Sequence, residues 1–210
     1  MLRKAETVFI IDDDLSVRRA ISLFLTAEGY NVIVYSGSEE YLEGEPHRGP
    51  GCILLDVNME GKSGLDLQQE LISMNSQLPI IFMTGYGNIP MSVQALKSGA
   101  VNFLEKPFKD EELIRSVEEA LLLSRKLTTD QEEIDKARNL ILSLTPREIE
   151  ILEQLMTGML NKQIAGVLDI AEHTVKLHRH SICDKLGVKS VPEIIRIADK
   201  AGIIPSEKKF

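Results

Sequence analysis

The residues that could do chemistry in the first half of this chain lie where short apolar segments end. They are Asp12, Asp13, Asp14, Asp56, Thr84 and Lys106. Carboxylates that lie close together repel one another, so the acidic members of this set fit one site only if a cation holds them. Because an oxygen-only site with few protein ligands suits Mg²⁺, the set predicts a magnesium site.

Asp56 is the candidate nucleophile of this site. With a metal offsetting the charge, its carboxylate can attack a phosphorus atom and form an acyl phosphate. The Thr84 hydroxyl and the Lys106 ammonium can then bind phosphoryl oxygens, and Gly85 leaves room for a close approach. A cis bond before Pro107 would aim Lys106 inward. Each residue alone also fits an ordinary solvated loop, and it is their joint occurrence that favours a site.

The segments that precede these residues have the pattern of parallel strands covered by helices. The predicted strands are Thr7–Ile11, Asn31–Tyr35, Cys52–Leu55, Ile80–Met83 and Val101–Leu104. Between the first two, apolar residues recur at helical spacing from Val17 to Leu25, and Gly29 can end that helix. In an open α/β sheet, sites form outside the carboxyl ends of the strands, where all the residues named above fall.

The second half of the chain is predicted to be helical. A stretch free of Gly and Pro runs from Asp110 to Leu142, and we interpret it as a helix that continues into a helical or partly frayed linker. Thr145 can cap the next helix with Glu148 as its partner. Four helices are predicted, at 146–157, 161–168, 172–186 and 190–201, the last capped by Ser190 with Glu193. The predicted organisation is a domain of residues 1–125, a helical linker of residues 126–143 and a four-helix domain of residues 144–210.

The helix predicted over 172–186 has two different faces. At about 100° per residue, its inward face contains Val175, His178, Ile182 and Leu186. Its opposite face contains His173, Lys176, Leu177, His180 and Asp184. With the short helix and turn before it, it predicts a helix-turn-helix whose second helix meets base edges in the major groove. Lys176 and His180 could donate to guanine or phosphate and Leu177 could touch a thymine methyl, whereas a solvated amphipathic helix is the alternative.

Residues 1–125 resemble the receiver domain of two-component response regulators. The matching residues are Asp12, Asp13, Asp56, Asn58, Thr84, Phe103 and Lys106, and the segments most similar to the FixJ subfamily are Met83-Thr84-Gly85-Tyr86-Gly87, Ser98-Gly99-Ala100-Val101 and Glu105-Lys106-Pro107-Phe108. The resemblance implies a flavodoxin-like, doubly wound sheet of strand order 2-1-3-4-5. It implies that Asp56 is the phosphoacceptor and that Thr84 and Lys106 bind the phosphoryl group. It also implies that Mg²⁺ is held by Asp12, Asp13, Asp56 and the backbone carbonyl of Asn58.

The receiver resemblance further implies a conformational switch. Phosphorylation would draw Thr84 inward, Phe103 would rotate into the vacated space, and the face formed by residues 90–122 would repack and dimerise. Phe103 stands where the family more often has a tyrosine, so the ring is kept and the hydroxyl is missing. The alternative is that Phe103 is only a core residue.

Residues 144–210 resemble the LuxR/NarL type of DNA-binding domain. The resemblance depends on Leu144-Thr145-Pro146-Arg147-Glu148, Asn161-Lys162-Gln163-Ile164-Ala165, Thr174-Val175-Lys176-Leu177-His178 and Lys185-Leu186-Gly187-Val188. It implies DNA contacts by Thr174, Lys176, Leu177, Arg179, His180 and Lys189, with Arg179 and Lys189 on phosphates. Ala171 stands where the family has a capping serine, so the cap of this helix is expected to be missing. The resemblance also makes helix 190–201 a dimerising element.

Charge is divided unevenly along the chain. The net charge is −8, yet residues 144–210 carry 10 Lys and Arg against 9 Asp and Glu, a net +1. A domain so weakly basic should bind DNA weakly, so affinity is expected to come from dimers on two half-sites. Cys52 and Cys183 are expected to be reduced core thiols. No apolar run is long enough to cross a bilayer, so we expect a soluble, cytoplasmic protein.

These resemblances together predict a transcription regulator. A sensor histidine kinase would phosphorylate Asp56, and dimers would then bind promoter DNA and activate transcription, with RNA polymerase as a further partner. The chain would be no enzyme beyond catalysing its own phosphoryl transfer and dephosphorylation. The FixJ subfamily admits nitrogen-fixation and aromatic-degradation circuits, and regulators of styrene or toluene catabolism are one candidate.

Two other functions fit part of the sequence. A phosphohydrolase with an aspartyl-phosphate intermediate also needs carboxylates and Mg²⁺ at strand ends, but it needs a second carboxylate two residues after the nucleophile, where this chain has Asn58. An output domain that binds protein or RNA is the other alternative. It is disfavoured for RNA because no aromatic residue occurs between Leu144 and Pro205 to stack on bases.

Overall fold

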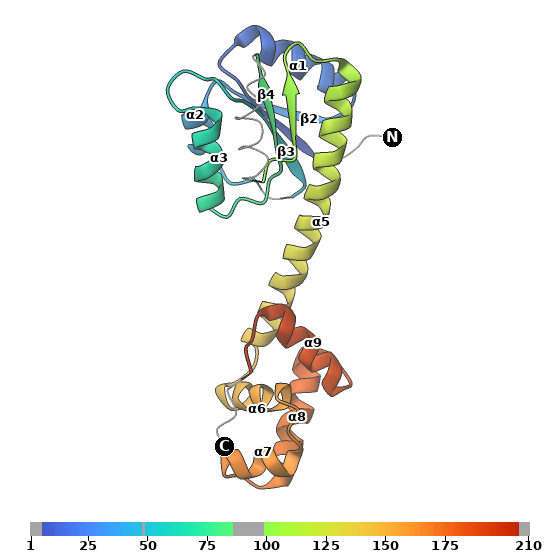
Figure 1. Cartoon of the computed structure of the whole chain (residues 1–210). Coiled ribbons are helices and arrows are strands. Elements are labelled where there is room, and N and C mark those ends of the chain that lie inside the picture. Colours follow the sequence, from blue (N-terminus) through green and yellow to red (C-terminus); the bar gives the residue numbers. More distant parts are fainter. Residues whose placement is uncertain (1–5, 48, 86–98, 206–210) are drawn as a thin grey trace. The chain divides into compact units, whose positions relative to one another are not determined.

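The computed structural model describes residues 6–47, 49–85 and 99–205. Contacts divide the chain into two compact units, Met1–Thr129 and Asp130–Phe210. Within the described residues, no helix is both long enough and apolar enough to cross a membrane. The first unit is a parallel sheet with helices on both faces and the second is all-helical, which confirms the predicted fold class (Figure 1).

The sheet of the first unit has five parallel strands in the predicted order, β2-β1-β3-β4-β5. The strands are β1 (Thr7–Ile11), β2 (Asn31–Tyr35), β3 (Gly51–Asp56), β4 (Ile80–Thr84) and β5 (Asn102–Glu105). The first two have the predicted bounds, and the others differ by one residue at their ends. Every residue of β1, β3 and β4 is buried, as expected for inner strands covered on both faces, whereas the edge strand β2 is partly exposed.

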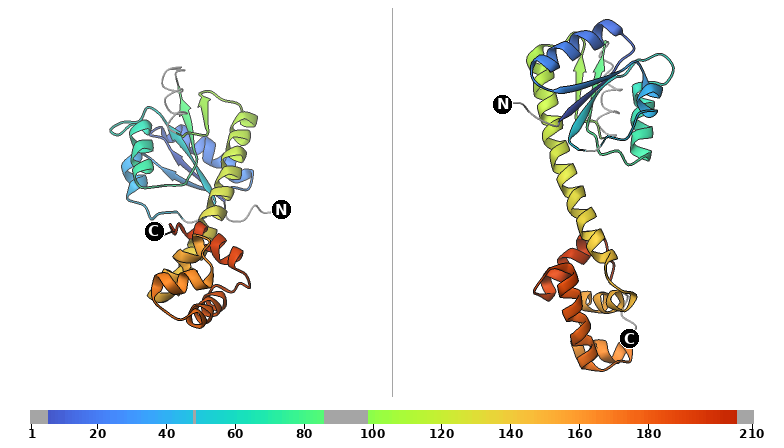
Figure 2. Two further views of the ribbon diagram at one scale, coloured as in Figure 1. Left: turned by 60° about the horizontal axis from the view of Figure 1, so that its bottom comes forward. Right: turned by 180° about the vertical axis from the view of Figure 1, so that it is seen from behind.

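Two apolar cores lie on opposite faces of this sheet. On one face α1 (Leu15–Ala27) and α5 (Asp110–Leu142) pack against the sheet, and on the other α2 (Ser38–Leu42) and α3 (Gly64–Ser73) do (Figures 1 and 2). Gly29 follows the end of α1 with a φ of 90°, a conformation that favours glycine, as predicted. The part of the predicted dimer face that covers residues 90–98 lies outside the described residues.

The second unit contains α6 (Pro146–Met156), α7 (Asn161–Leu168), α8 (Glu172–Leu186) and α9 (Val191–Ala201) around one apolar core. The helices α7 and α8 have their predicted bounds, and α6 and α9 differ by one residue at one end. The last turn of α5 contributes Ile141 to this core. Cys183 is half-buried rather than fully buried, while Cys52 is buried, and both are free thiols.

The helix starts of the second unit match the sequence predictions in two of three cases. Thr145 and Glu148 form the predicted capping box of α6, and Ala171 gives α8 no side-chain cap. The predicted capping pair of α9 is wrong for Ser190, whose side chain makes no capping hydrogen bond. The Glu193 carboxylate accepts from the Lys189 amide at 2.8 Å, and hydrogen bonds from Lys189 and Ser190 lower the pKa of Glu193.

Candidate functional site

Three carboxylates converge at the carboxyl edge of the sheet. Asp12 and Asp13 directly follow β1, and Asp56 is the last residue of β3. One carboxylate oxygen of each residue lies within 4.8 Å of one oxygen of each of the other two. Asp12 and Asp56 are buried and Asp13 is exposed. The adjacency of β1 and β3 in the sheet brings these residues together, because residues that follow neighbouring parallel strands meet at the same edge.

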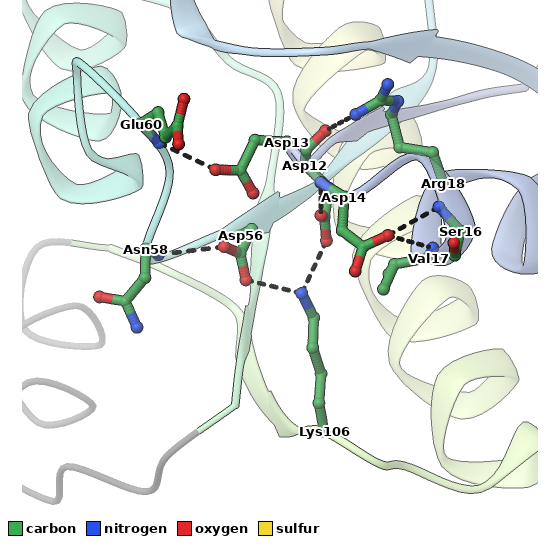
Figure 3. Close-up of polar contacts among 10 residues, drawn as sticks. All are labelled: Asp12, Asp13, Asp14, Ser16, Val17, Arg18, Asp56, Asn58, Glu60 and Lys106. Atoms are coloured by element: carbon green, nitrogen blue, oxygen red, sulfur yellow. Dashed lines mark hydrogen bonds and ion pairs between the residues drawn. The ribbon is translucent and has the colours of Figure 1, made fainter.

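Lys106 joins two of these carboxylates. It follows β5, and its Nζ donates to Asp12 Oδ2 and to Asp56 Oδ1, both at 2.7 Å (Figure 3). The Lys106–Pro107 bond is cis, as the sequence analysis anticipated. Burial would lower the pKa of Lys106, but its hydrogen bonds to Asp12 and Asp56 outweigh burial and raise that pKa. The lysine is therefore held in its charged form at neutral pH.

The surroundings of Asp56 disfavour the ionised form of its carboxylate. Burial is the largest effect and raises the pKa of Asp56. The hydrogen bond and charge of Lys106 lower this pKa, whereas the charges of Asp12 and Asp13 raise it, and the net result is a raised pKa. A cation placed among these oxygens would relieve both repulsions. Three carboxylates without nitrogen or sulfur ligands form a donor set that fits Mg²⁺.

Asp14 lies beside the three carboxylates but has a different role. Its Oδ1 accepts from the amides of Ser16 at 2.7 Å and Val17 at 3.3 Å, which makes Asp14 the N-cap of α1. These backbone hydrogen bonds lower the pKa of Asp14. The Arg18 guanidinium donates to the Asp12 carbonyl oxygen from the next turn of the same helix (Figure 3). The start of α1 therefore fixes the main chain that carries the first two aspartates.

The loop between β3 and α3 supplies two donors that the sequence analysis did not identify. The backbone amide of Asn58 donates to Asp56 Oδ2 at 3.1 Å, and the backbone amide of Glu60 donates to Asp13 Oδ2 at 2.9 Å. For Asn58, only the backbone carbonyl was expected to take part in the site. Backbone amides leave no signal in the sequence, because every residue except proline has one.

Thr84 and Phe103 lie on the neighbouring strands β4 and β5, with Thr84 at the carboxyl end of β4 and Phe103 opposite Phe82. Thr84 is the buried last residue of β4, and its carbonyl accepts from the Lys106 amide at 2.7 Å. A β-carbon at Gly85 would meet nothing within 4 Å, which is the open space that the sequence analysis inferred. Phe103 is half-buried and packs against the core on the α3 side of the sheet. Tyr86 and Gly87 lie outside the described residues.

The second unit presents the predicted helix-turn-helix in α7 and α8. Asp169 ends α7 in the left-handed conformation, with a φ of 50°. The inward face of α8 agrees with its predicted periodicity, because Val175, Ile182 and Leu186 are buried and His178 is half-buried. All five residues predicted for the opposite face are exposed: His173, Lys176, Leu177, His180 and Asp184. This exposed face of α8 is therefore accessible to a ligand within the described residues.

Several polar residues of α8 have partners on the surface of the unit. Lys176 Nζ lies 3.1 Å from Glu172 Oε1, and His180 Nε2 lies 3.5 Å from Asp184 Oδ2. Surface pairs of this kind stabilise the fold by only about 0–1 kcal/mol, so either basic side chain can exchange its partner at little cost. The other three residues with predicted DNA contacts differ in exposure. Thr174 and Arg179 are half-buried, and Lys189 is exposed. The Arg179 guanidinium donates to the Asn161 side chain.

Glu148 fixes α8 against the start of α6. Its carboxylate is buried and accepts from Lys185 Nζ at 2.6 Å, Ser181 Oγ at 2.6 Å and the Thr145 amide at 2.7 Å. Burial alone would raise the pKa of Glu148, but the hydrogen bonds from Lys185, Ser181 and Thr145 outweigh burial and lower the pKa to about 2. From the sequence, Glu148 was expected only to cap α6.

We expect Glu148→Gln to destabilise the second unit at pH 7 by on the order of 3 kcal/mol, from a pKa lowered from 4.5 to about 2. A carboxyl whose pKa is lower in the folded state stabilises the fold above its unfolded pKa, and the stabilisation is lost as the pH falls. The difference between wild type and variant should therefore shrink below pH 4.5 and vanish near pH 2. Amide hydrogen exchange in α6 and α8 measures this difference in stability.

The matched control is Glu150→Gln. Glu150 pairs with Arg147 on the surface of the same helix, and half of its side chain is exposed. Its replacement should change stability by less than about 0.5 kcal/mol. A difference for Glu148→Gln that stays constant between pH 7 and pH 3 would contradict the electrostatic origin of the effect.

Two models of known domain families match this chain. The family model described as "Response regulator receiver domain" matches residues 8–118, and the one described as "Bacterial regulatory proteins, luxR family" matches residues 142–198. The receiver match contains the acidic edge of the sheet, and the luxR match contains α7 and α8. Both matches agree with the units that the fold provides.

Several relatives are similar over nearly the whole chain. Nodulation protein W of Bradyrhizobium diazoefficiens is 39% identical over 196 residues, which are 93% of this chain and 86% of that protein. The transcriptional regulatory protein FixJ of Rhizobium meliloti is 36% identical over 95% of this chain and 98% of its own. The solved structure of the response regulator StyR has a TM-score of 0.82 at 40% identity, over 93% of this chain and 98% of that chain. The chain therefore belongs to the two-component response regulators, the transcription regulators that join a receiver domain to a LuxR-type DNA-binding domain.

Proposed function

We propose that this response regulator is phosphorylated on Asp56 by a sensor histidine kinase and then binds promoter DNA as a dimer to activate transcription. One observation supports the site above all others. Three carboxylates and one ammonium converge at a single edge of the sheet, with Lys106 Nζ 2.7 Å from both Asp12 and Asp56. Such a set can bind a cation and a phosphoryl group side by side.

Asp12, Asp13 and Asp56, with the backbone carbonyl of Asn58, would hold Mg²⁺, which supplies positive charge beside the transferring phosphoryl group. An Asp56 carboxylate oxygen forms a bond to phosphorus as the bond from phosphorus to the donor breaks, and the donor leaves with that electron pair. Lys106 exchanges a carboxylate for a phosphoryl oxygen, and the Thr84 hydroxyl donates to another.

Phosphorylation would act on the rest of the chain through Thr84 and Phe103. Thr84 moves toward the phosphoryl group, and the ring of Phe103, which is half-buried on the neighbouring strand, rotates inward. The repacked face, residues 90–122, forms the dimer. Two copies of α8 then bind two half-sites through Lys176, Leu177 and His180, with Thr174, Arg179 and Lys189 alongside, and RNA polymerase is recruited next to them. Control of styrene or toluene catabolism stays a prediction.

The experiment compares wild type and Asp56→Asn, each incubated with acetyl phosphate and Mg²⁺. Intact-mass spectrometry in acid should show one added phosphoryl group on wild type and none on the variant. Sedimentation should show a dimer only for phosphorylated wild type, and anisotropy should show tighter binding to a duplex selected from a random pool.

The outcomes separate the parts of the proposal. Equal labelling of both proteins would sink the assignment of Asp56. Labelling without a change in sedimentation would overturn the dimer, and a dimer that binds DNA no more tightly than the unphosphorylated protein would overturn its role in affinity.

A further inference from the structure

The start of α3 lies directly on the main chain of Asp56. On one side of this segment the Val57 amide donates to the Met83 carbonyl at 2.9 Å, and on the other the Gly64 amide donates to the Val57 carbonyl at 3.0 Å. A β-carbon on Gly64 would lie 2.2 Å from the Asp56 carbonyl oxygen and 3.1 Å from its carbonyl carbon. The end of β3 is therefore confined between β4 and the first turn of α3.

Glycine is needed at position 64 for space. Gly64 is the buried first residue of α3, and its φ lies outside the left-handed region that favours glycine. The atoms that a β-carbon would meet first belong to the backbone, so no side-chain rotation can move them away. Because β-carbons are essentially never found within 3.0 Å of such an atom, an added methyl group must displace the Asp56 peptide or α3 by roughly 1 Å.

We propose that Gly64 is a positioning residue for phosphoryl transfer, because it lets α3 fix the Asp56 main chain and thereby the distance from its carboxylate to Lys106 and the metal ligands. The inference rests on the proposed function of Asp56. A displacement of about 1 Å at a reacting group can cost about 100-fold in rate. Gly64 itself touches neither the phosphodonor nor the phosphoryl group.

The test measures phosphorylation of the full chain by acetyl phosphate and Mg²⁺ as a function of donor concentration. For Gly64→Ala we expect the rate constant at saturating donor to fall about 100-fold while the final label still reaches one phosphoryl group per chain. A purely structural defect would instead lower the final label and leave the rate constant of the folded fraction unchanged.

The matched control for the added methyl group is Gly37→Ala. Gly37 also stands at a helix start of the first unit, before α2, but a β-carbon there would meet nothing within 4 Å. Its rate constant should equal that of wild type. If wild type takes up no label, the proposed function fails. If wild type is labelled and folded Gly64→Ala is labelled at the same rate, the inference on Gly64 is overturned.

A second pair of variants tests the same point without adding an atom. Ser63 Oγ accepts from the Asp66 amide at 3.3 Å and caps α3, and Thr145 Oγ1 accepts from the Glu148 amide at 3.3 Å and caps α6. Ser63→Ala loosens the turn on Asp56 and should slow labelling about fivefold. Thr145→Ala loses the same kind of cap in the other unit and should leave the rate unchanged. Should Gly64→Ala fail to fold, equal rates for these two variants overturn the inference.

Discussion

Asp13→Asn is expected to weaken Mg²⁺ binding by at least about 100-fold, since loss of a group that only hydrogen-bonds to a metal ligand already costs about 10–100-fold. The Asp13 carboxylate is exposed and accepts from the Glu60 amide at 2.9 Å. The side-chain carbonyl of asparagine can accept the same hydrogen bond, so the substitution removes charge with little change of shape. Calorimetric titration with Mg²⁺ measures the affinity.

The neighbouring Asp14→Asn is the matched control. Asp14 accepts the amides of Ser16 and Val17 as the cap of α1, and asparagine caps a helix about as well as aspartate. Its charge is solvent-exposed and screened by salt. We expect its Mg²⁺ affinity to stay within about threefold of wild type. Equal losses for the two variants would contradict the division of roles between these adjacent aspartates.

The Asp13→Asn variant should also change stability, with a sign that depends on the metal. The pKa of Asp56 is raised above its ordinary 3.8 by burial, against the opposing effect of Lys106 and with the help of Asp12 and Asp13. A carboxyl with a raised pKa costs stability when ionised, and this cost disappears as the pH falls below the unfolded pKa. At neutral pH without metal the variant should therefore melt at a higher temperature than wild type, and with saturating Mg²⁺ at a lower one. Scanning calorimetry measures both.

The elements that sequence predicted best are those whose apolar pattern stops at a clear break, whether they are buried like β1 or partly exposed like β2. β1 and β2 have the predicted bounds, and so do α7 and α8, where breaks at Gly158 and Gly187 coincide with the pattern of apolar residues. Strand ends shifted where a polar residue continues the strand, as Asp56 does in β3. Sequence alone could not show that such a residue still pairs with the next strand.

The parts of the site that sequence could not predict depend on the main chain. The amides of Asn58 and Glu60 hold carboxylates, but any residue at those positions would offer an amide. The close approach of Gly64 to Asp56 depends on how α3 packs, and a glycine at a helix start fits an ordinary open turn equally well, as Gly37 does before α2. Ser190 shows the opposite case, because a valid capping pattern is present and yet the Ser190 side chain caps nothing, while the Glu193 carboxylate binds the Lys189 amide.

Lys176→Ala is expected to weaken binding of the phosphorylated protein to a selected duplex by roughly 5–150-fold, the cost of losing a contact to a base edge. The Lys176 side chain is 63% exposed on α8 and is paired only at the surface with Glu172. It can leave that pair for a guanine at little cost. Because residues 144–210 carry a net charge of only +1, few other contacts can replace it. Fluorescence anisotropy on selected and scrambled duplexes measures the loss.

Lys189→Ala is the comparison that separates base contacts from phosphate contacts. Lys189 is exposed beyond the end of α8, and the resemblance to LuxR-type domains places it on a phosphate. Its loss should weaken binding to both duplexes alike and lower the slope of log affinity against log salt by about 1 per phosphate contact. Lys176→Ala should instead lower the preference for the selected duplex. If Lys176→Ala weakens both duplexes equally, Lys176 contacts phosphate, and specificity must come from Leu177 and His180 on the same exposed face.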